Sequence, residues 1–306
     1  MHRRHLLKLS AAAAVASLFP TIVIKAAGNA IGPFRFCLNM STISGQKPGL
    51  LHSIEIAAAA GYDGVELWVR DIMEWLEQGN TVESLAKFIA AKKIRVENAI
   101  SFTEWMVDDD TKREAGLATL EKEMKMMAVL GCKRIAAPPA GVPKEQILDF
   151  QKAGARYRET LNLGRKYNVM PLLEFWGGSP TLYNFSQALA IAAAANDADA
   201  RILPDVYHLN RGGSGFDCLN LVNGKVIDII HINDYPGNKP VNELTDADRV
   251  YPGDGIAPYK KILHSLKAMG GTKTLSLELF NQSYWQKDAM LVANRGLEKM
   301  KNLVNM

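Results

Sequence analysis

Short runs of branched apolar residues recur along the chain, and they alternate with longer segments in which apolar residues return at helical spacing. The apolar runs predict eight strands, at residues 34–40, 64–69, 95–102, 133–139, 169–175, 200–206, 227–232 and 274–280. The clearest amphipathic segments predict helices at residues 49–61, 82–93, 114–131, 144–168, 185–195 and 259–271. Residues 216–225 give the weakest helical pattern, and Asn80 with Glu83 is a candidate capping box for the second helix.

Strands that are apolar along their whole length are typical of a parallel sheet covered on both faces by helices. Eight such strand–helix units predict an α/β fold, a (β/α)8 TIM barrel, formed by residues 28–306 as a single domain. An open, doubly wound sheet is the alternative. No GxGxxG motif follows the first strand, which argues against dinucleotide binding.

The first 27 residues differ from the rest and predict an export signal peptide. Arg3 and Arg4 precede a modest apolar run and small residues near a cleavage point, which resembles a twin-arginine signal. We expect cleavage and a periplasmic location, with a membrane-retained form as the alternative. The run is short and weakly apolar, so we expect no stable membrane span after cleavage.

The net charge changes once this segment is set aside. The whole chain carries +4; the segment contributes Arg3, Arg4, Lys8 and Lys25 and no acid, so residues 28–306 carry 4 − 4 = 0. This balance gives no support to nucleic-acid binding. The three cysteines are far apart and form no CxxC pair, so they are interpreted as free thiols, with one disulfide as the alternative.

Polar residues end the last four predicted strands, where a barrel places its chemistry. They are Glu174, Asp205, His231 and Glu278. Each alone has a structural explanation, as an ion-pair partner or a hydrogen-bonded core histidine. Together they predict one metal site, because buried carboxylates are costly unless they are paired or bind a cation. Three carboxylates and one imidazole favour Mn²⁺ or Mg²⁺, with Co²⁺ or Zn²⁺ as alternatives.

Several motifs make the chain resemble the xylose isomerase-like barrel superfamily, and within it the sugar (phosphate) isomerase and epimerase group. They are GYDGVELW, LLEFWG, the Asp-x-x-His of DVYHL, IHINDY, DRVYPGDG and SLELF. The resemblance covers the chain after residue 27 and is poorly specific for substrate, since this scaffold serves several chemistries.

Carried over by position, the resemblance makes Glu174, Asp205, His231 and Glu278 the metal ligands, and Glu174 with Glu278 the acid–base pair. His208 would contact a substrate oxygen, and Arg249 would contact substrate oxygens or a terminal phosphate. The implied reaction removes a proton beside a carbonyl and passes through an enediolate that the metal stabilises. Return of the proton to the opposite face of the same carbon epimerises the carbohydrate. Return of the proton to the adjacent carbon isomerises it.

Aromatic residues and one carboxylate are weaker candidates. Trp105 and Trp176 are candidate substrate contacts, and Trp68 is a candidate lining residue, with packing as the alternative for each. Asp234 either orients a histidine or lies at the surface.

Rival functions remain open at this stage. A lyase acting on a keto-sugar, keto-glycoside or cyclitol would begin with the same proton removal. A DNA-repair phosphodiesterase is disfavoured, because residues 28–306 hold only four histidines and no excess positive charge. An exported sugar-binding protein is the non-enzyme alternative. The substrate and the oligomeric state do not follow from the sequence.

Overall fold

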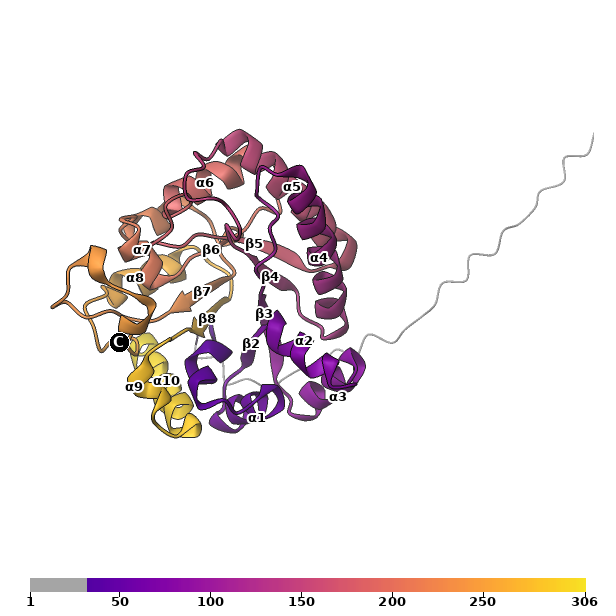
Figure 1. The fold of residues 1–306 in the computed structure, drawn as a ribbon. Helices are drawn as coiled ribbons and strands as arrows, with labels where there is room; N and C mark the ends of the chain where they lie inside the picture. Colours follow the sequence, from indigo (N-terminus) through magenta and orange to yellow (C-terminus); the bar gives the residue numbers. More distant parts are fainter. Residues whose placement is uncertain (1–31) are drawn as a thin grey trace, which may run out of the picture.

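The computed structural model describes residues 32–306, and the predicted signal peptide at residues 1–27 lies outside them. The described part is a closed barrel with the strands at the centre and the helices in an outer ring (Figure 1). The fold prediction of a single-domain (β/α)8 barrel is confirmed. The strands are β1 Phe34–Asn39, β2 Gly64–Trp68, β3 Arg95–Ile100, β4 Arg134–Ala137, β5 Met170–Glu174, β6 Ile202–Leu203, β7 Ile229–Ile232 and β8 Lys273–Leu277.

Parallel pairing runs in the order β3-β2-β1-β8-β7 and, separately, β4-β5-β6. The seam between β6 and β7 is closed by a parallel bridge between Asp205 and His231, with the His231 N–H donating to the Pro204 carbonyl at 3.0 Å. At the other seam, Arg134 Nη1 donates to the Glu97 carbonyl at 2.9 Å. Pro204 has no N–H to donate, which explains why β6 is short. Two predicted site residues therefore sit on the bridge that closes the barrel.

The helices agree with the periodic segments, with a few differences. They are α1 Leu50–Ala60, α2 Val69–Glu77, α3 Val82–Ala91, α4 Asp110–Val129, α5 Phe150–Tyr167, α6 Phe185–Ala194, α7 Val206–Arg211, α8 Tyr259–Ala268, α9 Gln282–Trp285 and α10 Ala289–Val304. Residues 144–149 do not join α5, because Asp149 caps that helix by accepting from the N–H groups of Gln151 and Lys152. The weak segment at residues 216–225 forms only a short 3-10 turn, Asp217–Leu221.

The predicted capping box of α3 is wrong by one residue. Thr81, not Asn80, is the N-cap, and its partner is Ser84 rather than Glu83. Asn80 instead donates to the Trp75 carbonyl and ends α2. The helix that intervenes between β2 and α3 explains the error, since Asn80 serves the helix before it.

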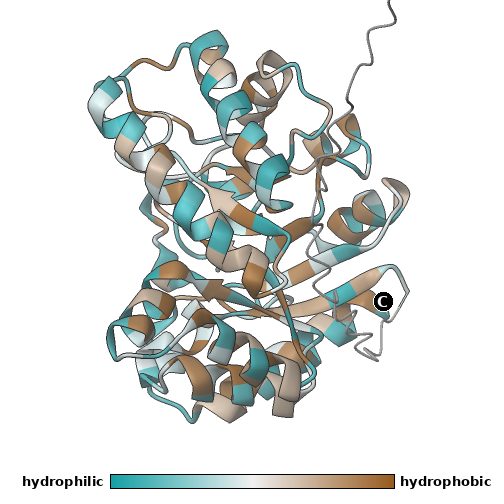
Figure 2. Ribbon diagram, turned by 90° about the vertical axis from the view of Figure 1, so that its right-hand side faces the viewer, coloured by the Kyte–Doolittle hydropathy of each residue, from teal (hydrophilic) through white to brown (hydrophobic). Residues whose placement is uncertain are grey.

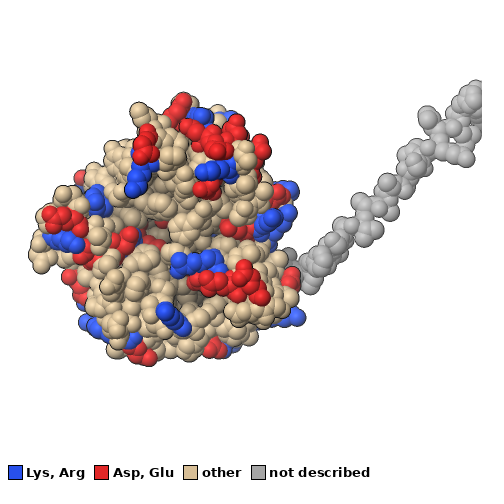
Figure 3. All heavy atoms as spheres, viewed as in Figure 1, with Lys and Arg blue, Asp and Glu red and all other residues tan. Residues whose placement is uncertain are grey.

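Apolar side chains fill the space between strands and helices. Hydrophilic and hydrophobic residues alternate along the helices of the ribbon in Figure 2. Positive and negative side chains are scattered over the face in Figure 3, which is hollowed toward its middle. Within residues 32–306, no helix combines the length and the apolar character that crossing a membrane requires. Cys37, Cys132 and Cys218 are free thiols, as the sequence predicted.

Candidate metal centre and surrounding cavity

Three of the four predicted metal ligands meet at one end of the barrel. Asp205 follows β6, His231 lies in β7 and Glu278 follows β8. One ligand atom from each can be chosen so that all three lie within 4.8 Å of one another, and all three side chains are buried. Glu174, at the end of β5, is buried nearby but is not in this group. The structure thus gives a cluster of two carboxylates and one imidazole that can hold a metal ion.

The imidazole of His231 is held in one orientation by Glu66 of β2. His231 Nε2 lies 3.0 Å from Glu66 Oε1, and because a carboxylate only accepts, Nε2 must carry the proton. His231 Nδ1 faces Glu278 Oε2 at 3.2 Å and Asp205 Oδ2 at 3.6 Å. Nδ1 is buried and has no hydrogen-bond partner among the described residues. A buried nitrogen aimed between two carboxylates fits a cation.

Glu66 itself is fully buried and fully paired. Its Oε1 accepts from Asn98 Nδ2 at 2.7 Å as well as from His231. Its Oε2 accepts from Asn39 Nδ2 and Ser276 Oγ, both at 2.7 Å. Four donors saturate the carboxylate and fix it in place. Sequence reasoning missed Glu66, although a charged residue in the middle of the apolar run GVELW was a usable signal.

Arg249 places a positive charge among the carboxylates. Its Nη1 donates to Asp205 Oδ2 at 2.9 Å and to Glu278 Oε2 at 2.7 Å, and its Nη2 donates to Asp246 Oδ1 at 2.5 Å. The guanidinium is buried, with its central carbon 4.6 Å from the centre of the Tyr207 ring. Arg249 therefore holds the same two oxygens that His231 Nδ1 faces.

The carboxyl groups of the centre differ in their electrostatic environment. Burial raises the pKa of Glu174 to about 8, and Glu278 and Glu66 add to this rise while His231 opposes it. Burial also raises the pKa of Asp205, to about 6, although Arg249 opposes it. At Glu278 the effect of burial is outweighed by His231 and Arg249, so its pKa is lowered. Burial disfavours a charged imidazole, but Glu278 and Glu66 raise the pKa of His231 well above its usual value.

A cavity of about 690 Å³ lies over the cluster, and we call it the site cavity. Its wall includes Glu174, Glu278, His208, Arg249, Trp68, Trp176 and Phe280. A volume of this size is ordinary for a small-molecule site. Polar groups from the late strands and aromatic rings therefore face the same space.

His208, the first predicted substrate contact, lies in the short helix α7 beside the cluster. Its Nδ1 accepts from the Gly177 N–H at 3.0 Å, so the neutral ring carries its proton on Nε2. Burial, with Arg249 adding to it, lowers the pKa of His208 well below its usual value, which favours this neutral form. Nε2 lies 3.2 Å from Arg249 Nη2, so the imidazole and the guanidinium are in direct contact.

Two predictions about single residues need correction. Trp105 is fully buried, donates from Nε1 to the Pro138 carbonyl at 2.9 Å and packs on Tyr157, so it is a core residue and does not line the cavity over the cluster. Asp234 is also buried, and it neither orients a histidine nor lies at the surface. It accepts from the backbone N–H groups of Tyr235, Gly253 and Ala257, and so shapes the loop after β7.

Lys144 also lines the site cavity, and two other cations near it are already engaged. Arg211 donates to the carbonyls of Leu244 and Asn242, and Lys239 pairs with Asp248 at 2.6 Å. With Arg249 held by carboxylates, the described residues place no cluster of free cations that would favour a terminal phosphate.

Comparison with known proteins identifies the family of this fold. A model of the xylose isomerase-like TIM barrel family matches residues 54–303. The chain belongs to this family. Inosose isomerase from Bacillus velezensis is 29% identical over 265 residues, covering 83% of this chain and 91% of that protein. Inosose isomerase from Bacillus subtilis is 27% identical over 262 residues, with 83% and 92% covered.

Among solved structures, the IOLI protein, described as having a binding zinc atom, superposes with a TM-score of 0.81 at 25% identity. The match covers 89% of this chain and 98% of that one. D-psicose 3-epimerase, solved in the presence of D-fructose, superposes with a TM-score of 0.71 at 15% identity, covering 89% of this chain and all of the other. At 15% identity the likeness to the epimerase shows the fold alone.

Proposed function

We propose that this protein is a divalent-metal-dependent isomerase or epimerase that moves a proton beside the carbonyl of a sugar or cyclitol. One observation carries the proposal. His231 Nδ1 is oriented by Glu66, is unpartnered among the described residues, and faces the buried carboxylates of Asp205 and Glu278. The similarity to inosose isomerases supports the choice of reaction and of a polyhydroxylated ring as substrate.

Asp205, His231 and Glu278 fit a divalent cation, and Glu174 would complete the set. The carboxylate-rich donors favour Mn²⁺ or Mg²⁺, and the zinc atom of the IOLI relative makes Zn²⁺ a further candidate, with Co²⁺. When bound, such an ion polarises a carbonyl and makes the neighbouring C–H more acidic.

Glu174 is suited to the proton transfer itself. Burial raises its pKa to about 8, so the carboxyl can both accept and return a proton near neutral pH. In the proposed reaction Glu174 takes a proton from the carbon beside the carbonyl, which leaves an enediolate. A proton taken from solvent by way of Glu278 and delivered to the opposite face of that carbon inverts it, while Glu174 releases its proton to solvent. Return of the proton by Glu174 to the former carbonyl carbon, with transfer of the hydroxyl proton between the two oxygens, interconverts aldose and ketose.

His208 and Arg249 would hold substrate oxygens. Nε2 of His208 and Nη2 of Arg249 lie 3.2 Å apart, and both residues line the site cavity. Donors aimed where negative charge develops stabilise an enediolate oxygen. Trp176 and Trp68 line the same cavity and would pack on the apolar face of the ring.

The test is hydrogen exchange beside a carbonyl. The protein is incubated in deuterated water with Mn²⁺ and a panel of ketoses, keto-glycosides and inososes, and NMR follows deuterium uptake and new products. We expect uptake at the carbon next to the carbonyl, and a product with all atoms retained. Loss of a group from the substrate would instead identify a lyase, and binding without exchange would identify a sugar-binding protein.

Two variants make this test specific. Glu278→Gln keeps the size of the side chain and should reduce uptake by about 10²-fold to 10⁴-fold. Glu243→Gln, which removes an exposed carboxylate from the loop after β7, should leave uptake unchanged. Equal rates in wild type and Glu278→Gln would remove that residue from the reaction.

We also propose export by the twin-arginine route, which rests on Arg3, Arg4 and the apolar run after them. Fractionation of cells that express the full chain should recover the protein from the periplasm. An Arg3→Lys, Arg4→Lys variant should stay in the cytoplasm, and equal export of both would refute the proposal.

A further inference from the structure

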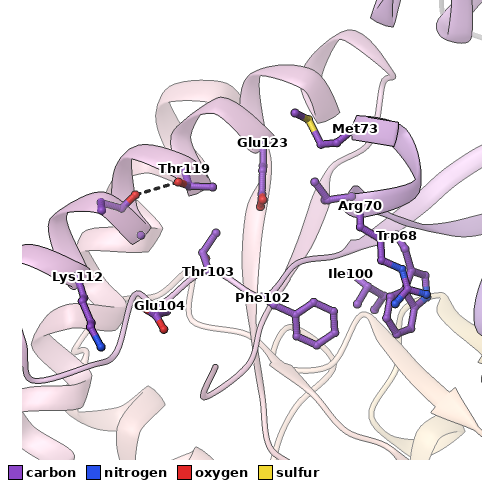
Figure 4. Close-up of a pocket in the computed structure, with 13 residues that line it drawn as sticks. Trp68, Arg70, Met73, Ile100, Phe102, Thr103, Glu104, Lys112, Thr119 and Glu123 are labelled. Carbon is purple, nitrogen blue, oxygen red and sulfur yellow. Dashed lines mark hydrogen bonds between the residues drawn. The ribbon is translucent and has the colours of Figure 1, made fainter. Parts of the chain in front are cut away.

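A second cavity, of about 460 Å³, adjoins the site cavity and plays no part in the metal centre. It lies between the ends of β2 and β3 and the helices α2 and α4, and we call it the side cavity (Figure 4). Trp68, Ile100 and Phe102 line both cavities. The two spaces are therefore neighbours that share one apolar boundary.

Phe102 is the most unusual residue of that boundary, because 49% of it is exposed. Its ring centre lies 5.5 Å from that of Trp68 and 6.1 Å from that of Trp176. Three aromatic rings thus form a continuous surface from the site cavity to the side cavity. An exposed apolar surface of this kind next to a binding site is typical of ligand contact.

The side cavity also offers polar groups that suit hydroxyls. Glu123 points into it from α4 and is 9% exposed; its Oε2 accepts from Ser101 Oγ at 2.6 Å, and its Oε1 accepts no hydrogen bond from the described residues (Figure 4). Thr103 lines the same cavity, and its buried hydroxyl has no partner among the described residues. Buried polar atoms normally have partners, so the Thr103 hydroxyl is unusual, and the free Oε1 of Glu123 is an acceptor that a hydroxyl of a ligand in this cavity can use.

The charges around the side cavity favour a neutral ligand. Arg70 pairs with Asp71 at 3.1 Å and lies over the Trp68 ring at 4.2 Å. Lys112 faces a rim that also holds Glu104, and Glu123 lies deeper inside. An anion would be repelled by the Glu123 carboxylate. A neutral ring with hydroxyls could pack its apolar face on the aromatic side chains and form hydrogen bonds with the polar ones.

We propose that the side cavity binds a second ring, so that the substrate is a glycoside whose keto ring lies at the metal centre and whose second ring crosses Phe102. This inference rests on the proposed function for the position of the keto ring. It deepens that function by naming the substrate class as two-ring glycosides of neutral sugars.

The test uses substitutions that place a bulky side chain in the side cavity without changing a residue of the site cavity. Ala115 of α4 is exposed and lines only the side cavity of the two, and Ala115→Phe places a ring in it. Ala118→Phe is the matched control, because Ala118 is exposed on the same helix but lines a separate hollow with Glu121 and Glu159. Thr119→Phe fills the side cavity from the next turn and guards against misfolding of the first variant.

The readout is the ratio of kcat/KM for deuterium uptake by a keto-glycoside with a phenyl or glucosyl group to that by a one-ring inosose. In wild type and Ala118→Phe we expect the two-ring compound to be favoured. In Ala115→Phe and Thr119→Phe the ratio should fall about threefold to tenfold, the range expected for the loss of one ring–aromatic contact. A ratio that does not change in either filled variant would overturn the inference.

Calorimetry separates this inference from the proposed function. Phenyl β-glucoside and methyl β-glucoside carry no keto group, so their binding needs no turnover. If the phenyl compound binds more tightly than the methyl compound, and Ala115→Phe removes this difference, the second-ring site is supported. This holds even if no substrate exchanges a proton, a result that would contradict only the proposed function. Exchange on one-ring substrates without any gain from a second ring would sink only the inference.

Discussion

The ends of the late strands and the ends of the early strands of this barrel do different work. Glu174 ends β5, Asp205 and Glu278 follow β6 and β8, and His231 lies inside β7. On the early strands, the apolar ring of Trp68 ends β2 and that of Phe102 follows β3, next to the side cavity. The late side gathers charge and the early side gathers apolar surface, so one half of the rim is equipped for proton chemistry and the other for the shape of a ligand.

Below the rim the two halves are joined by a layer of buried polar groups. Asn39 of β1 donates to Glu66 of β2 and, at 3.0 Å, to Glu278 after β8. Glu66 in turn holds His231 of β7. The early strands thus orient the charged residues of the late strands from underneath. The charged residues lie on one side of the rim, but the hydrogen-bonded layer below it extends across the barrel. Residues of the early strands can therefore fix the candidate metal ligands of the late strands.

The largest expected effect is a loss of metal affinity when Asp205, on the late strands, is substituted. In Asp205→Asn the amide can still accept the His208 N–H, but its NH₂ group would face Arg249, Asn233 and the cation. We expect metal affinity to fall at least about 100-fold, beyond the usual effect of an outer residue. Metal retained after dialysis, measured by mass spectrometry, checks this. Asp217→Asn, at an exposed position, is the control, and equal metal content in both would contradict a role for Asp205.

Glu66→Gln tests the layer beneath the rim without touching the cavity. A glutamine offers an NH₂ group in place of one oxygen, so two of the four donors to Glu66 would lose their acceptor. We expect metal affinity to fall about 10-fold to 100-fold, with a loss of about 1–3 kcal/mol in the free energy of unfolding. Metal titration and urea unfolding measure the two effects. Glu123→Gln is the matched control, and if it weakened metal binding as much, the special place of Glu66 would be refuted.

The late side was easier to predict from the sequence than the layer that supports it. Each strand-end residue stands where an apolar run stops, and a barrel brings all such ends to one face. Glu66 and Asn39 lie within or at the end of early strands, and nothing in their spacing shows that they reach across the barrel to His231 and Glu278. Such contacts depend on strand register and on barrel closure, which the pattern of apolar residues does not fix.

The errors have similar physical causes. Trp105 follows β3 just as Phe102 does, but Trp105 turns into the core and Phe102 turns to the cavity. The sequence gives two aromatic residues in one loop and no indication of which one points outward. The helix α2 was missed because its apolar positions continue directly from β2, so the end of the strand and the start of the helix share one apolar run.

A smaller effect is expected at Trp68, which contacts both regions. Its Nε1 donates to Asn39 Oδ1 at 2.9 Å and so fixes the amide whose nitrogen serves Glu66 and Glu278. Trp68→Phe keeps an aromatic ring but loses this hydrogen bond, worth about 0.5–1.5 kcal/mol. We expect metal affinity to fall about threefold to tenfold. Trp176→Phe is the control, because Trp176 lines the cavity without contacting Asn39, and a similar loss in both would mean that only ring size matters.

The smallest expected effect is on the pH dependence of stability, and it distinguishes the buried carboxyl groups of Glu278 and Glu123. Burial acts on both, but Glu278 has Arg249 and His231 beside it and its pKa is lowered, whereas Glu123 has only the Ser101 hydroxyl and its pKa is raised. A raised pKa means that the folded protein holds the proton more tightly than the unfolded chain does. The stability from Glu123 is therefore present below its ordinary value of 4.5 and is lost as the pH rises through the raised pKa.

Glu123→Gln removes this titration while keeping an acceptor for Ser101. We expect the variant to match wild type near pH 4 and to melt about 2 °C higher near pH 7, because the cost of an ionised buried carboxylate is gone. Melting temperatures measured across this range give the comparison. If the difference in melting temperature between the variant and wild type stays constant with pH, ionisation of Glu123 does not destabilise the fold. The early side of the rim would then compensate a buried negative charge as well as the late side does.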